Sequence, residues 1–336
     1  MIVDARVLRD DFIPGEIKHR NSEVNELSKT LEPLTEDGQA QKSLIHGPPG
    51  TGKTCISQYT LQKLEEEILD LKYYYVNCWE NYNRFKVLYK ALEGLGKTLQ
   101  VHRQSTPTDE LYSRLRNSVS QPYVLILDEV DQLEDEKVLY DLNQIPDLNL
   151  IMIANTEESV FYNMDDRIRS RLMDARRIEF KEYTSDQLED ILKYRVDNGL
   201  KPRSIDRGNI RKIALSSEGD ARIAIGILRA SARKAEEQGM DEITSELIQE
   251  SIPEAKDRNQ QKNVEKLNPH QQELYEIIKE EEEIKPRDLY DRYREEMEDP
   301  KSERMLRKYL NKMKHYNLVE SEGSGRWTTY MPAEEP

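Results

Sequence analysis

Gly47, Gly52, Lys53 and Thr54 stand at the spacing of a phosphate-binding loop, within the segment "LIHGPPGTGKTCISQY". Glycines let backbone N–H groups close around phosphate oxygens, where a larger side chain would clash. The segment begins with a short apolar run and leads into a helical pattern, so the positive end of a helix would face the same phosphates. We therefore predict that Lys53 contacts the β- and γ-phosphates of ATP and that Thr54 ligates Mg²⁺. The predicted nucleotide contacts of the loop are Pro48, Pro49, Gly50, Thr51, Gly52, Lys53, Thr54 and Cys55.

Acidic partners for such a loop are present in the segment "YVLILDEVDQL". Its apolar run, residues 123–127, is typical of a buried parallel strand, which presents the residues after it at the nucleotide edge of a sheet. We predict that Asp128 holds Mg²⁺, directly or through water, and that Glu129 orients and deprotonates the attacking water. A further apolar run, "LNLIMIANT", leads to Asn155, whose amide is predicted to position the same water.

These three strand ends resemble those of an AAA+ ATPase, and the chain resembles the archaeal origin-recognition initiators along nearly its whole length. That family is related to the eukaryotic origin recognition complex and to its cell-division-cycle loading factor. The resemblance implies an α/β P-loop AAA+ domain with a parallel sheet, followed by an all-helical lid and a C-terminal winged-helix domain. It also implies ATP or ADP and Mg²⁺ as cofactors.

Two segments carry the resemblance outside the phosphate-binding loop. The stretch "FIPGEIKHRNSEVNEL" is similar to the family's N-terminal segment and implies that His19 and Arg20 pack near the adenine. The stretch "MDDRIRSRL" resembles the arginine-bearing segment after the third strand. It implies Arg167 and Arg171 as candidate arginine fingers, and Arg171 is favoured because it belongs to the Ser-Arg pair.

Two further segments resemble the family's lid. The stretch "EYTSDQLEDILKYR" resembles the opening of the lid and implies nucleotide contacts by Tyr183 and Arg195. From the residues alone, the start of a helix with a surface arginine is an equally good interpretation. The stretch "SSEGDARIAIGILRAS" resembles the sensor-2 helix and implies that Arg222 points at the γ-phosphate.

The positions of these motifs predict how the chain is divided into domains. Residues 1–180 would form the nucleotide-binding domain, residues 181–252 the helical lid, residues 253–264 an exposed polar connector and residues 265–336 the winged helix. Three helices are predicted in the last domain, in "PHQQELYEIIKEEE", "KPRDLYDRYREEM" and "SERMLRKYLNKMKHYN", the third with Ser302 as its N-cap. Two strands are predicted in "LVESEGSGRWTTYM".

Residues 301–314 contain six Lys or Arg and one Glu, in a chain with a formal net charge of −15. At about 100° per residue, a helix would separate an apolar face around Leu306 and Leu310 from a basic face around Arg304 and Lys308. A solvated surface is the ordinary interpretation of a lone basic helix. Its position as the third helix of a winged helix favours contact with DNA instead. The predicted DNA contacts are Lys301, Arg304, Arg307, Lys308, Lys312 and, just after the wing tip, Arg326.

The composition excludes several classes of protein. Charged residues make up 34% of the 336 residues, and the mean hydropathy is −0.85. No apolar run approaches the roughly 20 residues that cross a bilayer, so no membrane partner is predicted. Cys55 and Cys78 lack the spacing of a disulfide framework or a zinc site. These features predict a cytoplasmic protein, and the expected contact with DNA implies association with the nucleoid.

The function predicted is that of an ATP-dependent replication initiator, which binds double-stranded origin DNA and uses slow, Mg²⁺-dependent ATP hydrolysis as a switch. The resemblance implies the replicative helicase and other AAA+ initiator subunits as further partners. One alternative is a Holliday-junction branch-migration motor, although the third strand of such motors normally ends in threonines. Another alternative is a DNA-binding regulator with ATP as a conformational ligand, against which Asp128 and Glu129 argue.

One segment departs from the family pattern. The family has an additional DNA-contacting helix where this chain has "LEGLGKTLQVHRQSTPTDELYSRL". Lys97, His102 and Arg103 keep the segment basic, but the glycine expected just after the proline is missing near Pro107. Contact between residues 94–110 and DNA is therefore left open.

Overall fold

The computed structural model describes residues 1–36, 38–99, 101–102, 105–161, 164–323, 325 and 328–333, without the side chains of Glu36 and His315. The chain divides into two compact units, Met1–Ile248 and Gln249–Pro336. Within the described ranges, no helix has both the length and the apolar character needed to cross a membrane.

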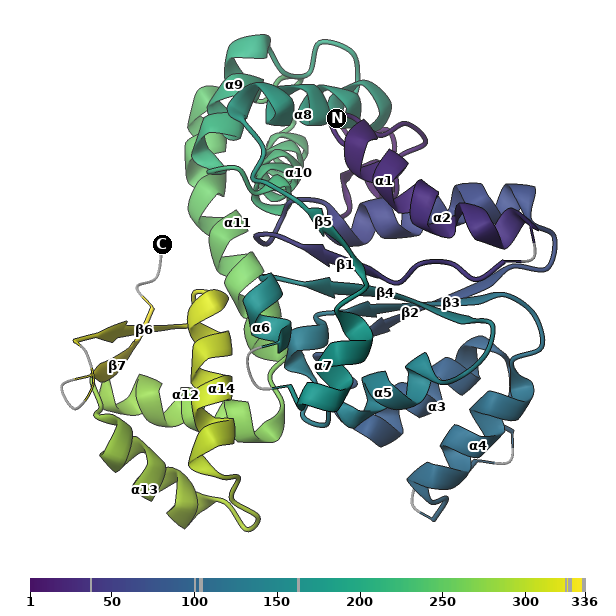
Figure 1. Ribbon diagram of the computed structural model, residues 1–336. Coiled ribbons are helices and arrows are strands. Elements are labelled where there is room, and N and C mark those ends of the chain that lie inside the picture. Colours follow the sequence, from purple (N-terminus) through teal and green to yellow (C-terminus); the bar gives the residue numbers. More distant parts are fainter. Residues whose placement is uncertain are drawn as a thin grey trace. The chain divides into compact units, whose positions relative to one another are not determined.

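A five-stranded parallel sheet forms the centre of the first unit, with strand order β2-β3-β4-β1-β5 among the described residues (Figure 1). The predicted parallel sheet is thus confirmed. Its strands are β1 (Ser43–His46), β2 (Lys72–Asn77), β3 (Tyr123–Asp128), β4 (Leu148–Ala154) and β5 (Arg176–Glu179). The short, charged strand β5 was not predicted, because it lies at an edge of the sheet and lacks an apolar run. The order β3-β4-β1 brings the carboxyl ends of the three predicted strands side by side.

Helices cover both faces of this sheet (Figure 1). The helices that precede β5 in the sequence, with 3-10 helices written as η, are η1 (Ala5–Leu8), α1 (Asn21–Leu31), η2 (Glu32–Glu36), α2 (Lys53–Glu67), α3 (Arg84–Gly94), α4 (Thr108–Ser118), η3 (Val130–Gln132), α5 (Lys137–Asn143), α6 (Glu157–Phe161) and α7 (Asp166–Leu172). Helices α1 and α2 pack on one face, and α3, α4, α5 and α7 contribute side chains to the layer on the other.

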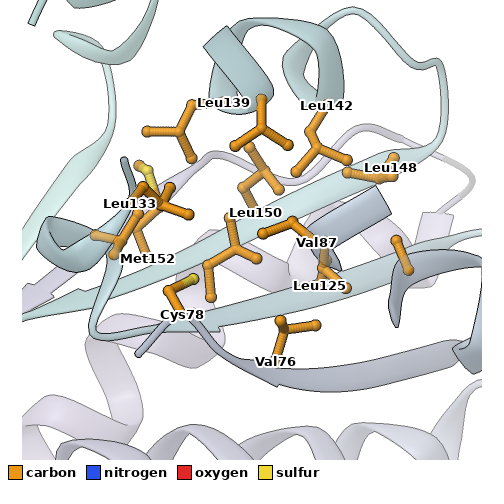
Figure 2. Close-up of a cluster of buried hydrophobic side chains, with 14 of the residues drawn as sticks. Val76, Cys78, Val87, Leu125, Leu133, Leu139, Leu142, Leu148, Leu150 and Met152 are labelled. Atoms are coloured by element: carbon orange, nitrogen blue, oxygen red, sulfur yellow. The ribbon is translucent and has the colours of Figure 1, made fainter. Parts of the chain in front are cut away.

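The period-2 alternation of strand side chains explains this division into two hydrophobic layers. In β3, Leu125 faces the layer that includes α3 and α5, whereas Ile126 faces the layer beneath α1 and α2. Figure 2 shows the first layer, in which Leu139 and Leu142 from α5 lie over Leu150 of β4. Both faces of the sheet are therefore buried, as expected for parallel strands.

After the sheet, the chain forms helices α8 (Ser185–Gly199), α9 (Arg207–Ser216) and α10 (Ala221–Glu237), followed by α11 (Ser245–Glu265). Helix α8 begins with a capping box, in which Thr184 and Gln187 satisfy each other's backbone N–H groups. Helix α11 runs from the first unit into the second. Residues 253–264, the expected connector, are therefore helical, and Pro253 lies inside the helix without donating a backbone hydrogen bond.

The second unit contains α12 (Pro269–Glu281), α13 (Pro286–Glu296) and α14 (Glu303–His315), followed by β6 (Val319–Glu322) and β7 (Thr329–Pro332). Strands β6 and β7 pair in an antiparallel hairpin, and an isolated bridge joins Ile284 to Tyr330. This is the predicted winged-helix order of three helices and two strands. Ser302 occupies the N-cap position of α14, as predicted, but its side chain makes no capping hydrogen bond.

Candidate functional site

The loop between β1 and α2 has a backbone that only glycine adopts readily. Gly50 and Gly52 have φ values of 72° and 92°, in the left-handed region. A Cβ atom on Gly50 would lie 1.9 Å from Asp220 Oδ1, and a Cβ atom on Gly52 would lie 2.8 Å from the Tyr183 hydroxyl. The loop therefore has no side chains at these two positions before α2, so its backbone N–H groups could approach a phosphate group.

Lys53, the first residue of α2, is 8% exposed. Its Nζ donates hydrogen bonds to the carbonyl oxygens of Gly47, at 2.5 Å, and Pro48, at 2.7 Å. Burial lowers the pKa of Lys53 from 10.5 to about 8, while the nearby Asp128 carboxylate raises it and the Arg222 guanidinium lowers it further. The ammonium is thus held at the loop next to another cation, an arrangement that phosphate anions would stabilise.

The two predicted ligands of Mg²⁺ meet in the structure. Thr54 Oγ1 donates to Asp128 Oδ2 at 2.5 Å, although 74 positions separate the two residues in the sequence. Tyr75 also donates its hydroxyl to Asp128 Oδ2, at 3.0 Å, and the backbone N–H of Glu129 donates to Asp128 Oδ1 at 2.9 Å. A hydroxyl and a carboxylate are hard oxygen ligands, so this donor set fits Mg²⁺.

Glu129 and Asn155 follow the neighbouring strands β3 and β4. Glu129 has a φ of 56°, a left-handed conformation that is costly for a residue with a side chain and recurs at functional sites. Asn155 is buried, and its carbonyl oxygen accepts a hydrogen bond from Gly47 N at 3.1 Å. Because β4 lies between β3 and β1, Asn155 lies between Asp128 and the phosphate-binding loop.

The start of α10 contacts the same loop from the lid. Asp220 caps α10 by accepting hydrogen bonds from Arg222 N and Ile223 N, and Ala221 N donates to Gly50 O at 3.1 Å. The Arg222 guanidinium pairs with the Asp220 carboxylate at 2.9 Å. The start of α10 therefore lies at the phosphate-binding loop, with Asp220 orienting the Arg222 guanidinium, and contact between Arg222 and the γ-phosphate stays a prediction.

Arg20 directly precedes α1 and is 5% exposed. Its guanidinium donates to Glu23 at 2.7 Å and to Lys181 O at 2.5 Å, and it stacks on the ring of Tyr183 at 4.1 Å. Burial raises the pKa of Tyr183. His19 pairs through Nε2 with Asp190 of α8 at 2.8 Å. The structure thus stacks Arg20 on Tyr183, whose hydroxyl lies beside Gly52 of the loop, while His19 contacts α8. Contact of His19 and Arg20 with adenine stays a prediction.

Arg195 is 6% exposed, so the interpretation of a surface arginine is wrong. Its guanidinium donates to the carbonyl oxygens of Val7 at 2.6 Å, Arg9 at 3.2 Å and Phe12 at 3.3 Å, and it lies over the Phe12 ring. A buried guanidinium must pair its donors, and the N-terminal segment supplies the acceptors. Arg195 therefore anchors that segment to α8, and its contact with nucleotide stays a prediction.

Arg167 and Arg171 lie one turn apart on α7, and both are exposed. The Arg171 guanidinium lies over the ring of Tyr140 in α5, at 4.9 Å. The Arg171 carbonyl accepts a hydrogen bond from Lys42 Nζ at 2.7 Å. Both side chains are therefore accessible to another subunit, and their role as arginine fingers stays a prediction.

The basic helix α14 packs its apolar side chains inward and exposes Arg304 and Arg307, while Lys301 and Lys308 are half-buried. Lys312, one of the predicted DNA contacts, does not lie on the exposed face of α14, because its side chain is 5% exposed. Lys312 lies one turn from both Tyr309 and Tyr316, which are buried, so it belongs to the edge of the buried face. The exposed basic surface is therefore narrower than the helical wheel indicated.

Two predicted basic residues, Arg103 and Arg326, lie outside the described residues. Of the segment at residues 94–110, Lys97 and His102 are exposed, and Leu99 is 98% exposed. Helix α3 ends at Gly94 and α4 begins at Thr108, so the described residues between them are not part of an α-helix.

Sequence reasoning missed Tyr75 and Asp220, both of which contact the predicted site. Tyr75 is one of three consecutive tyrosines in β2, and only the pairing of β2 with β3 identifies which of them faces Asp128. Asp220 directly precedes a helix start, and an acidic N-cap is a recognisable signal. Its approach to Gly50 depends on the tertiary structure.

Comparisons with known proteins agree on one family. The AAA domain family matches residues 36–159, and the Cdc6 AAA+ ATPase-type lid domain family matches residues 189–252. The ORC1-type DNA replication protein 1 of Halobacterium salinarum is 51% identical over 307 residues, 91% of this chain and 100% of that protein. The ORC1-type DNA replication protein 9 of the same organism is 45% identical over 330 residues, 98% of this chain and 93% of that protein.

A solved structure has the same fold. The Aeropyrum pernix ORC1 protein, in complex with DNA, matches with a TM-score of 0.79 and 24% sequence identity. The match covers 99% of this chain and 94% of that chain.

Proposed function

Because the chain belongs to the family of ORC1-type DNA replication proteins, we propose that it is an ATP-dependent replication initiator that binds origin DNA and helps to recruit the replicative helicase. The observation that carries the ATP part is the contact between Thr54 and Asp128, at 2.5 Å, beside the buried Lys53. The A. pernix ORC1 protein, which has the same fold, was solved in complex with DNA, and this supports the proposal that this chain binds DNA.

In the proposed nucleotide site, each residue has a separate task. The backbone of residues 47–52 and the start of α2 would hold the phosphates, and Lys53 would neutralise them. Thr54 and Asp128 would hold Mg²⁺, which when bound supplies positive charge to the β- and γ-phosphate oxygens. Glu129 would accept a proton from the attacking water, and Asn155 would orient that water.

We assign the domains by these tasks. Residues 1–180 would bind nucleotide, and residues 181–252 would form a lid that brings Tyr183 and Arg222 to it. Residues 253–264 would connect this lid to the DNA-binding domain at residues 265–336. The hydrolysis would be slow, because the rate enhancement by an arginine finger needs a second AAA+ subunit.

The alternative of a branch-migration motor is less well supported, because the ORC1-type relatives share up to 51% identity over nearly the whole chain. Footprinting distinguishes the two functions. An initiator protects one discrete element at the origin, whereas a branch-migration motor protects four-way junctions of any sequence. Protection of junctions without preference for origin DNA would contradict the proposed function.

ATP binding at pH 8 is expected to take up protons, because the pKa of Lys53 in the nucleotide-free protein is lowered to about 8. Phosphate anions favour the charged ammonium and so raise this pKa on binding. The affinity for ATP should therefore fall as the pH rises through about 8, rather than near the ordinary value of 10.5. Calorimetry in two buffers of different ionisation enthalpy measures the proton uptake.

Lys53→Arg serves as the control for this measurement, because arginine stays charged throughout the pH range. Any proton uptake that remains in Lys53→Arg belongs to other groups or to ATP itself. Equal uptake by the parent protein and Lys53→Arg would show that Lys53 is already fully charged before ATP binds.

Arg304→Ala is expected to lower the preference for origin over scrambled duplex by about 5- to 150-fold, since an arginine that reads guanine contributes about 1–3 kcal/mol of discrimination. Arg307→Ala, also on the exposed face of α14, should instead weaken binding to both duplexes and lower the salt slope by about one unit. Binding of each variant to both duplexes across a salt series checks these expectations.

Lys63→Ala removes the same charge from α2, in the other unit, and should leave the binding of both duplexes nearly unchanged. If Arg304→Ala and Arg307→Ala bind both duplexes as Lys63→Ala does, then α14 is only a solvated helix face.

A further inference from the structure

Tyr75, in β2, contacts the carboxylate of Asp128, and the proposed nucleotide site gives it no task. Its hydroxyl donates to Asp128 Oδ2 at 3.0 Å, and the same oxygen accepts from Thr54 Oγ1 at 2.5 Å. The other carboxylate oxygen accepts from Glu129 N at 2.9 Å. Donors from β2, α2 and the residue after β3 therefore determine the orientation of this carboxylate.

The sheet register explains why Tyr75 reaches this position. Strands β2 and β3 pair in parallel with Tyr75 beside Ile126 and Asn77 beside Asp128. Side chains at alternate positions share a face, so Tyr75 and Asp128 both point toward the face that α2 covers. The ring of Tyr75 packs against the hydrophobic layer beneath α1 and α2, which fixes the direction of its hydroxyl.

We propose that Tyr75 is a positioning residue that holds the Asp128 carboxylate in the orientation needed to bind Mg²⁺ with ATP. A phenol suits this task because it donates a hydrogen bond without bringing a positive charge, so the charge of Asp128 stays available to the metal. A cation at the same place would compete with the metal for that charge. Residues that orient a metal ligand typically change metal affinity by 10- to 100-fold when they are removed. The inference rests on the proposed nucleotide site.

Tyr75→Phe tests this inference, because it keeps the ring and removes only the hydroxyl. Binding of a slowly hydrolysed fluorescent ATP analogue would be titrated with Mg²⁺, and separately measured in EDTA. We expect Tyr75→Phe to need about 10-fold more Mg²⁺ for half-maximal enhancement of binding. Its affinity for the analogue in EDTA should match that of the parent protein.

Tyr74→Phe is a matched control on the same strand. The Tyr74 hydroxyl donates to Glu93 Oε2 at 2.7 Å, and its ring packs against the other hydrophobic layer. This variant loses a tyrosine hydroxyl and one hydrogen bond to a carboxylate, yet its requirement for Mg²⁺ should equal that of the parent protein.

Three other outcomes of this experiment would contradict the inference. An unchanged Mg²⁺ requirement in Tyr75→Phe would overturn the inference and leave the proposed function standing. Loss of analogue binding in EDTA by Tyr75→Phe would also overturn it, because Tyr75 would then support the fold rather than the metal site. If Mg²⁺ does not affect analogue binding by the parent protein, the proposed metal site itself is wrong, and the inference fails with it.

Discussion

Glu129→Gln is expected to bind ATP like the parent protein and to hydrolyse it about 100-fold more slowly, or slower still. Glutamine keeps the shape of glutamate but cannot accept a proton from water, and a general base typically contributes 10²- to 10⁴-fold to the rate. The Asp128 carboxylate would keep its hydrogen bond from the backbone N–H of residue 129, so the metal site should remain intact. Single-turnover hydrolysis and equilibrium ATP binding measure the two effects separately.

Glu67→Gln provides a chemically identical control. Glu67 is the last residue of α2 and is exposed, about 20 Å along the helix from the phosphate-binding loop. It should hydrolyse ATP at the parent rate. Lys53→Ala should differ from Glu129→Gln and Glu67→Gln in its affinity for ATP, because it removes the ammonium that neutralises the phosphates. Equal turnover in Glu129→Gln and the parent protein would rule out Glu129 as the base.

Arg171→Ala is expected to lower ATP turnover about 1,000-fold in assembled protein and to have no effect in the dilute monomer. An arginine finger supplied in trans is worth about 10³- to 10⁵-fold, because it stabilises charge on the transferring phosphoryl group. Arg171 is exposed on α7, so it is accessible to the nucleotide site of another subunit. Turnover per subunit, measured over a range of protein concentrations, checks this expectation.

Arg167→Ala is the matched variant for comparison with Arg171→Ala, because Arg167 lies one turn earlier on the same helix. A mixing experiment gives a stricter test. Glu129→Gln keeps the finger but lacks the base, and Arg171→Ala keeps the base but lacks the finger. Neither variant should hydrolyse ATP well alone, whereas a mixture should recover activity through mixed assemblies. A large loss in the Arg171→Ala monomer would instead place Arg171 in its own site or in the support of the fold.

The residues of the proposed nucleotide site could be selected from the sequence because the motifs that contain them are encoded locally. The loop requires glycines at particular backbone angles, as the φ values of Gly50 and Gly52 illustrate. The apolar runs that became β1, β3 and β4 lead to Lys53 and Thr54, Asp128, and Asn155. Since parallel strands place their carboxyl ends at one edge of the sheet, these residues had to meet. The winged-helix order was predictable for a similar reason, because the helices and strands differ in period.

The contacts between these elements were decided only by the tertiary structure. Three consecutive tyrosines occur in β2, and the register with β3 selects Tyr75 as the partner of Asp128. Asp220 lies next to Gly50, although about half the length of the sequence separates the two residues. Arg195 pairs with the N-terminal backbone. Lys312 joins the buried side of α14 although its charge predicts a solvated position. Local periodicity separates the two faces of a strand or helix. The face that a boundary residue such as Lys312 joins, and the neighbours that each residue meets, depend on strand register and packing between distant segments.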